Sequence, residues 1–187
     1  MGTGSREAPR ERVAARRAPL VRAFRALGDL MLRLPRWAAA LLALGWMGWI
    51  TWLSSAPRGP EGGAPLWSYA ANLAHGPLYG ALAVLCIAAL PRRRGPFVWA
   101  DLGPRSVVFV LAAVGAFALL DEWHQSIRPG RQASWTDVAT DLAAAAAVVV
   151  AARAAGDPDV RPARLVRILV LGCGAVLAAA LVATLAG

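Results

Sequence analysis

The chain has 187 residues, of which 58% are hydrophobic, with a mean hydropathy of +0.50 and a formal net charge of +9. A soluble domain of this length buries a core but does not carry repeated apolar runs of membrane-spanning length. All 20 basic residues are arginines, which lie between the apolar runs and in the N-terminal part. This distribution is typical of membrane topology signals and argues against nucleic-acid binding.

The N-terminal part divides into two segments before the first apolar run. Residues 1–19 are rich in Arg, Ala, Gly and Pro without an apolar period, which predicts a disordered basic tail. Residues 20–35 place apolar side chains on one helical face and arginines with one aspartate on the other. This pattern predicts a basic amphipathic helix in the headgroup layer of the membrane.

Five apolar runs follow, and each has roughly the 17–25 residues that a bilayer core requires. They cover about 37–54, 71–90, 105–124, 136–153 and 165–186. The predicted fold class is therefore an all-α membrane protein, a bundle of about five transmembrane helices preceded by the interfacial helix. We divide it into a four-helix core over 36–154 and a cytoplasmic loop with the fifth helix over 155–187. The fourth run is rich in Ala and Val, and we expect it at the centre of the bundle.

The arginine count predicts the topology. The N-terminal part and the loops after the second and fourth runs together hold 17 arginines, and the remaining connections hold three. The positive-inside rule then places the N-terminus in the cytoplasm and the C-terminus outside the cell membrane.

Unusual polar residues gather at the predicted extracytoplasmic ends of three helices. They are His75, Asp121, Glu122, His124, Gln125, Arg131, Asp137 and Asp141. At 100° per residue, Asp121, His124 and Gln125 share one face of the third helix, with Glu122 on its flank and Trp123 opposite. Ionisable groups at membrane depth are costly and usually mark a functional site, so we expect one inward-facing pocket.

Several chemistries fit this set of side chains. If the protein is an enzyme, Asp121, Glu122 and His124 are the candidate catalytic acid–base residues. A binding site would instead use side chains suited to a phosphate or polar headgroup, namely His75, Tyr79, Gln125, Arg131, Ser134 and Asp137. In a purely structural reading, Asp137 would favour the positive end of its helix dipole and Arg131 would neutralise a nearby aspartate.

No metal site or cofactor is predicted. Glu122-Trp123-His124 does not have the His-Glu-x-x-His spacing of zinc hydrolases. The two cysteines, Cys86 and Cys173, lie inside separate apolar runs with no neighbour at metal-ligand spacing, which indicates packing residues.

The polar run resembles the signature of the VanZ-like family of bacterial membrane proteins. The similarity lies in Asp121-Glu122-Trp123-His124-Gln125, followed by Pro129-Gly130-Arg131-Gln132-Ala133-Ser134 and then Asp137, with weaker agreement at Ser54-Ser55-Ala56-Pro57, His75 and Tyr79. Where the family often has an Asn followed three residues later by Gly, this chain has Asp141 and Ala144. The resemblance implies a small multi-pass envelope protein of the bacterial inner membrane. The founding member of the family is linked to resistance to the glycopeptide teicoplanin.

Three functional hypotheses remain open from the sequence. The first is a protein that binds or moves a lipid headgroup or a lipid-linked cell-wall precursor at the outer leaflet. The second is a membrane-embedded hydrolase or transferase that uses Asp121 or Glu122 with His124. The third is a structural or partner-binding membrane protein in which the polar set holds the helices together. No protein partner is identified by the sequence.

Overall fold

The computed structural model describes residues 19–55, 65–129 and 133–186. Residues 1–18, which form nearly all of the predicted tail, lie outside the described residues, as does the predicted anion ligand Arg131. The described residues form six helices: α2 (Pro19–Leu32), α3 (Arg36–Ser54), α4 (Pro65–Ala89), α5 (Pro104–Ser126), α6 (Trp135–Ala155) and α7 (Pro162–Ala186).

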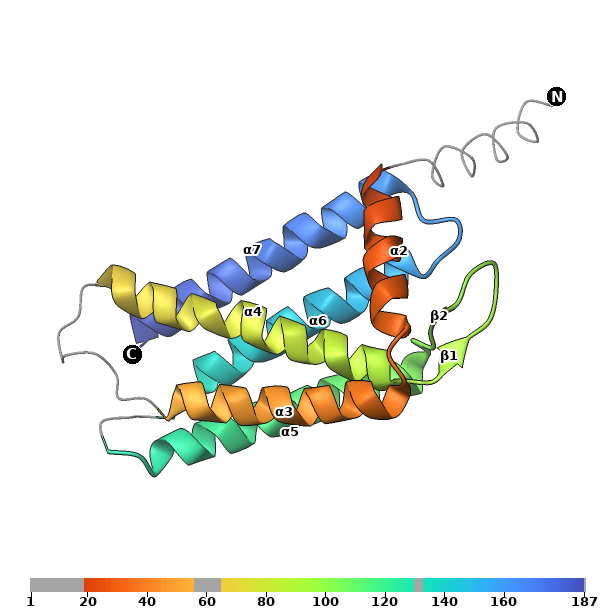
Figure 1. Cartoon of the computed structure of the whole chain (residues 1–187). Coiled ribbons are helices and arrows are strands. Elements are labelled where there is room, and N and C mark those ends of the chain that lie inside the picture. Colours follow the sequence, from red (N-terminus) through yellow and green to blue (C-terminus); the bar gives the residue numbers. More distant parts are fainter. Residues whose placement is uncertain (1–18, 56–64, 130–132, 187) are drawn as a thin grey trace.

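Helices α3 to α7 run side by side as a bundle, and α2 crosses one end of it (Figure 1). Each of the five bundle helices is long and apolar enough to cross a membrane. At 1.5 Å per residue they are about 29–38 Å long, which matches the roughly 30 Å of a bilayer core. The predicted fold class, five membrane helices preceded by a short helix, is confirmed.

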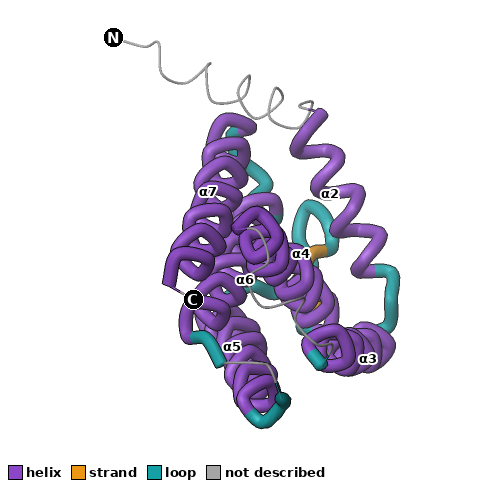
Figure 2. The backbone as a smooth tube through the Cα atoms, turned by 90° about the vertical axis from the view of Figure 1, so that its left-hand side faces the viewer, coloured by secondary structure: helices purple, strands orange, loops and turns teal. Residues whose placement is uncertain are grey.

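Helix α6 is the centre of the bundle, as its small residues predicted. It packs against α4, α5 and α7 and also touches α2, an arrangement that is visible along the bundle axis in Figure 2. Half of its membrane-spanning window is buried, against a third or less in each of the other four helices. Its alanines permit close packing, because a Cβ on Gly172 of α7 would lie only 2.8 Å from the Cβ of Ala147.

The helix bounds differ from the predicted runs chiefly at α4. This helix begins at Pro65, six residues before the predicted run, because proline suits the first position of a helix, where its missing N–H is not needed. It also continues through Pro77. A short antiparallel pairing of β1 (Arg92–Arg93) with β2 (Trp99–Ala100), which the sequence analysis did not predict, closes the loop between α4 and α5.

Helix α2 is fixed to the bundle by Trp99 and Arg25. The Trp99 ring lies so close to Gly28 of α2 and to Gly156 after α6 that a Cβ at either glycine would overlap it. Its indole N–H donates to the carbonyl of Ala152 at 3.0 Å. The Arg25 guanidinium donates to the carbonyls of Ala155 and Asp157, and it lies 4.6 Å from the centre of the Phe97 ring. The amphipathic helix is thus an integral part of the fold.

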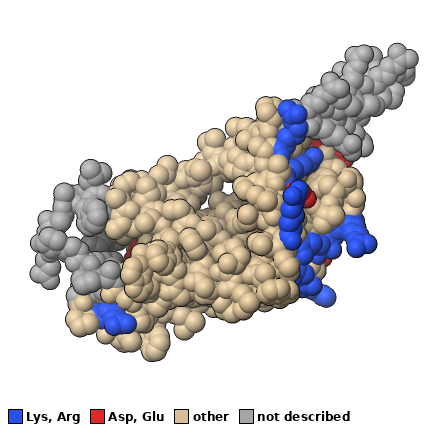
Figure 3. Space-filling model, in the orientation of Figure 1, with Lys and Arg blue, Asp and Glu red and all other residues tan. Residues whose placement is uncertain are grey.

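Charge is strongly segregated along the bundle axis. Among the described residues, 12 of 13 arginines lie at the end that α2 crosses, which we call the arginine-rich end, and only Arg128 lies at the other (Figure 3). The eight described carboxylates divide equally between the two ends. The three-dimensional charge distribution therefore has the polarity that the positive-inside rule requires.

This segregation predicts the orientation of the protein in the cell membrane. In a chain whose two cysteines are replaced by alanine, Ser126→Cys at the far end should react with a membrane-impermeant maleimide in intact cells. The matched variant Gly95→Cys, in the β1–β2 loop, should react only after the cells are permeabilised. Both positions are exposed, so the reverse labelling pattern would mean that the arginine-rich end faces outward.

Candidate functional site

A cluster of polar side chains from four helices lies at the end of the bundle opposite the arginine-rich end. We call this set the polar cluster, and its members are Ser54, Ser55, His75, Tyr79, Asp121, Glu122, His124, Gln125, Ser134, Asp137 and Asp141. Its four carboxyl groups are at most 5% exposed. Carboxylates this deeply buried persist only where hydrogen bonds or opposite charges compensate for lost solvation, so each one needs an account of its partners.

Asp121 joins three helices. One of its carboxylate oxygens accepts a hydrogen bond from the Ser54 hydroxyl of α3 at 2.6 Å. The other accepts from the Tyr79 hydroxyl of α4 at 3.4 Å and from the Gln125 amide, one turn along α5, at 3.1 Å. The carboxylate is 2% exposed, so these bonds replace the water that it lacks.

Glu122 connects α5 to the start of α6. One carboxylate oxygen accepts from the backbone N–H of Ser134 at 2.6 Å, and the other accepts from the Gln125 amide at 3.2 Å. The Ser134 hydroxyl in turn caps α6 by accepting from the backbone N–H of Asp137 at 3.3 Å. Asp137 is buried in the first turn of α6, where the positive end of the helix dipole favours a carboxylate.

His75 and Asp141 form a buried pair between α4 and α6. The His75 Nδ1 lies 3.0 Å from one carboxylate oxygen of Asp141, and an ionised Asp141 accepts a hydrogen bond from the Nδ1–H tautomer. The imidazole stacks in parallel on the Tyr79 ring, with ring centres 6.0 Å apart. Asp141 is 1% exposed, and its second oxygen has no hydrogen-bond partner among the described residues. This oxygen is therefore a buried acceptor for which the described residues supply no donor.

His124 lies at the more open edge of the polar cluster. Its Nε2 is 3.1 Å from the Ser55 hydroxyl and 3.3 Å from the Nε of Arg128, which is exposed. The Ser55 hydroxyl also contacts the backbone carbonyl of Thr51 at 2.6 Å. A hydroxyl has one proton to donate, and the shorter contact favours donation to Thr51.

The structure brings together most of the residues that the sequence singled out. The described members of that set that meet in the polar cluster are His75, Tyr79, Asp121, Glu122, His124, Gln125, Ser134 and Asp137. On α5, Trp123 is 63% exposed while Asp121, Glu122 and Gln125 are buried, as the predicted helical face requires, but His124, which was placed on that face, is only partly buried. Although Asp121 and His124 were placed on one helical face, no hydrogen bond joins them among the described residues, because His124 contacts Ser55 and Arg128.

Two further features were not assigned from the sequence. Ser54 and Ser55, which were noted only for the family resemblance, supply hydroxyls from α3 to Asp121 and His124. The two adjacent hydroxyl residues at the end of an otherwise apolar span could have indicated in the sequence that α3 contributes to the site. Asp141 is also more central than expected, because it forms the ion-pair partner of His75.

No group of three His, Cys, Asp or Glu side chains in the described parts of the chain has the geometry of a metal site. The Asp121 and Glu122 carboxylates accept hydrogen bonds from protein donors: Ser54 of α3, Gln125 of α5 itself and Ser134 before α6.

Comparisons with known proteins add no assignment to this geometry. No family model matches the chain, and the searches of the curated proteins and of the solved structures found no match. Functional conclusions must therefore come from the site itself.

The three-helix role of Asp121 predicts its effect on stability. Asp121→Ala removes one acceptor group and leaves the donors of Ser54, Tyr79 and Gln125 unsatisfied in a buried region. We expect the free energy of unfolding in detergent to fall by about 2–4 kcal/mol. The matched variant Asp29→Ala removes an exposed carboxylate paired with Arg33 and should cost well under about 1 kcal/mol. Equal losses of stability in the two variants would contradict the conclusion that Asp121 holds three helices together.

Proposed function

We propose that this membrane protein binds the polar headgroup of a membrane lipid or of a lipid-linked envelope precursor in the polar cluster. By the arginine distribution, the cluster would face the extracytoplasmic leaflet. The observation that supports the proposal is the second carboxylate oxygen of Asp141, which is buried and has no hydrogen-bond partner among the described residues. An unsatisfied carboxylate oxygen costs free energy, and a ligand that supplies a donor recovers it.

The available groups define the chemistry of the ligand. In the depth of the cluster, Asp141 requires a hydrogen-bond donor such as an ammonium, a hydroxyl or an amide N–H. At the open edge, the exposed Arg128, whose Nε donates to His124 Nε2, has further N–H groups suited to a phosphate oxygen. A phosphate-bearing headgroup that also carries amine or hydroxyl donors, as in aminophospholipids and lipid-linked sugars, fits both ends.

The resemblance to the VanZ-like family agrees with this proposal, because it implies an envelope protein. A link to glycopeptide resistance would follow if the bound headgroup belonged to a cell-wall precursor. Within the family, an Asn often stands where this chain has Asp141, so the donor-binding carboxylate would be a feature of this chain's specificity.

A second candidate function is a membrane-embedded hydrolase or transferase, and one contact favours it. The Ser55 hydroxyl lies 3.1 Å from the Nε2 of His124, within the range of a nucleophile and its base. Two observations weigh against it. The Ser55 proton has a nearer acceptor in Thr51, and the described hydrogen bonds of His124 include no carboxylate to orient the imidazole. Headgroup binding therefore ranks first.

The proposal predicts the behaviour of a nearly isosteric variant, Asp141→Asn. The remaining amide oxygen still accepts from His75, while an NH₂ group replaces the free acceptor, so the fold should persist and a donor-bearing headgroup should bind about tenfold more weakly. The measurement is native mass spectrometry of the purified protein with phosphatidylethanolamine, phosphatidylglycerol and a polyprenyl-phosphate-linked sugar. Asp29→Asn, at the opposite end, is the matched control and should leave affinity unchanged.

Two results would contradict headgroup binding. The first is that neither these lipids nor a native lipid extract binds the unaltered protein. The second is that Asp141→Asn binds each lipid as tightly as the control does. Catalysis is tested separately with Ser55→Ala: conversion of a bound lipid that stops in Ser55→Ala, while binding persists, would replace the binding proposal with the enzymatic one.

A further inference from the structure

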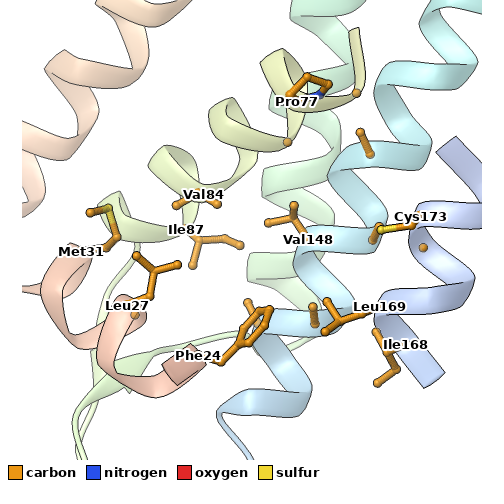
Figure 4. Close-up of a pocket in the computed structure, with 18 of the residues that line it drawn as sticks. Phe24, Leu27, Met31, Pro77, Val84, Ile87, Val148, Ile168, Leu169 and Cys173 are labelled. Atoms are coloured by element: carbon orange, nitrogen blue, oxygen red, sulfur yellow. The ribbon is translucent and has the colours of Figure 1, made fainter. Parts of the chain in front are cut away.

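Two cavities among the described residues differ in the charge of their linings. The larger has a volume of about 590 Å³ and is bounded by α2, α4, α6 and α7 (Figure 4). No charged side chain lines it in the described parts of the chain, so it does not discriminate between headgroups. The smaller has a volume of about 430 Å³, and two of the residues that line it are arginines, Arg36 and Arg105.

The smaller cavity lies at the arginine-rich end, where three membrane helices begin or end. Arg36 is the first residue of α3, Ala89 is the last of α4 and Arg105 is the second of α5. Cys86 and Phe109 line the cavity from within the helices, and Phe109 lies about 6 Å deeper than Arg105 at 1.5 Å per residue. The rim is therefore at the level of lipid headgroups, and the walls reach the start of the hydrocarbon.

Arg36 is held at the rim by a backbone contact. Its Nε donates to the carbonyl of Ala89 at 3.1 Å. This carbonyl belongs to the last turn of α4, where the helix itself provides no amide donor. The side chain is exposed, and its two terminal nitrogens have no hydrogen-bond partner among the described residues. One edge of the guanidinium thus fixes its position and the rest can bind an acceptor.

Arg105 is exposed and makes no hydrogen bond or ion pair with any described residue. The carboxylate nearest to it in the sequence, that of Asp101, accepts from the backbone N–H of Gly103 at 3.3 Å. The first turn of α5 contains no acidic residue. Within the described parts of the chain, neither arginine of the cavity has a carboxylate counter-ion.

The lining fits a ligand that is both anionic and apolar. Two guanidinium groups match the oxygens of a phosphate in charge and in donor geometry. Cys86, Leu90 and Phe109 add apolar walls, which a free phosphate would leave unused. Basic pockets between membrane helices are known to bind anionic headgroups. Phosphatidylcholine fits less well, because its choline group would bring a further positive charge close to the two arginines.

We propose that this cavity binds the phosphate of an anionic phospholipid from the leaflet at the arginine-rich end, with Arg36 and Arg105 donating to it. The start of an acyl chain lies against Cys86 and Phe109. The bound lipid supplies the counter-charge for one arginine from α3 and one from α5, and so connects these helices. The site lies at the opposite end of the bundle from the polar cluster, so it does not depend on headgroup binding there.

The test uses the full chain in phosphatidylcholine vesicles with trace phosphatidylglycerol that carries a photoactivatable group next to the glycerol. After irradiation, the cross-linked residues are mapped by mass spectrometry. We expect labelling of residues 86–91 and 105–109 to exceed that of residues 162–167 about fivefold. The reference residues lie at the same end, at the start of α7, and include arginines. A phosphatidylcholine probe with the same photoactivatable group should label both sets of residues equally.

Charge-matched variants separate the cavity from the general positive charge of this end. Arg105→Gln should reduce phosphatidylglycerol labelling of the cavity about fivefold, and adding Arg36→Gln should reduce it further. Arg93→Gln combined with Arg94→Gln removes exposed charge from the β1–β2 hairpin. This control should change labelling by less than about twofold, because salt screens charges that do not contact the lipid.

Three results would overturn the proposal. Equal labelling of the cavity by the two lipid probes would show that net negative charge is not selected. Equal losses in the cavity and hairpin variants would assign the effect to diffuse surface charge. Displacement of the lipid by excess inorganic phosphate would assign the site to a free anion. If Arg36→Gln lowers the melting temperature, Arg105→Gln decides alone, since this side chain makes no described hydrogen bond or ion pair.

Discussion

A carboxylate at membrane depth has no water to solvate it, and this constraint shapes the end of the bundle where the polar cluster lies. Asp121 and Glu122 are satisfied only because donors arrive from α3, α4, α5 and the residue before α6. The same bonds fix how those helices meet. Each donor is thus both a solvating group and a positional restraint, and the packing of four helices at this end depends on two adjacent acidic residues.

Asp141 differs from Asp121 and Glu122, because only one of its two carboxylate oxygens has a described hydrogen-bond partner. One oxygen is held by His75 and the other has no partner among the described residues, although the side chain is fully buried. A bundle selected only for stability would gain by satisfying or removing that oxygen. Our proposal assigns this oxygen to a ligand, and under that proposal Asp141 differs from Asp121 and Glu122, whose hydrogen bonds join helices.

Much of this architecture could be predicted from the sequence, because the hydrocarbon core imposes simple rules. Span number, the central place of the alanine-rich α6 and the outward position of Trp123 followed from run length, residue size and helical period. The partners of His124 and Asp141 could not be predicted, since they depend on helix rotation and on side chains from α3 and α4.

The central claim, that the polar cluster is a headgroup site, is tested most directly by an experimental structure of the protein purified with its native lipids. We expect density for a headgroup whose donor lies within hydrogen-bond distance of the second Asp141 oxygen, with a phosphate near Arg128. A structure in which a protein side chain occupies that position, or in which only a lattice of water fills the cluster while lipid is bound elsewhere, would contradict it.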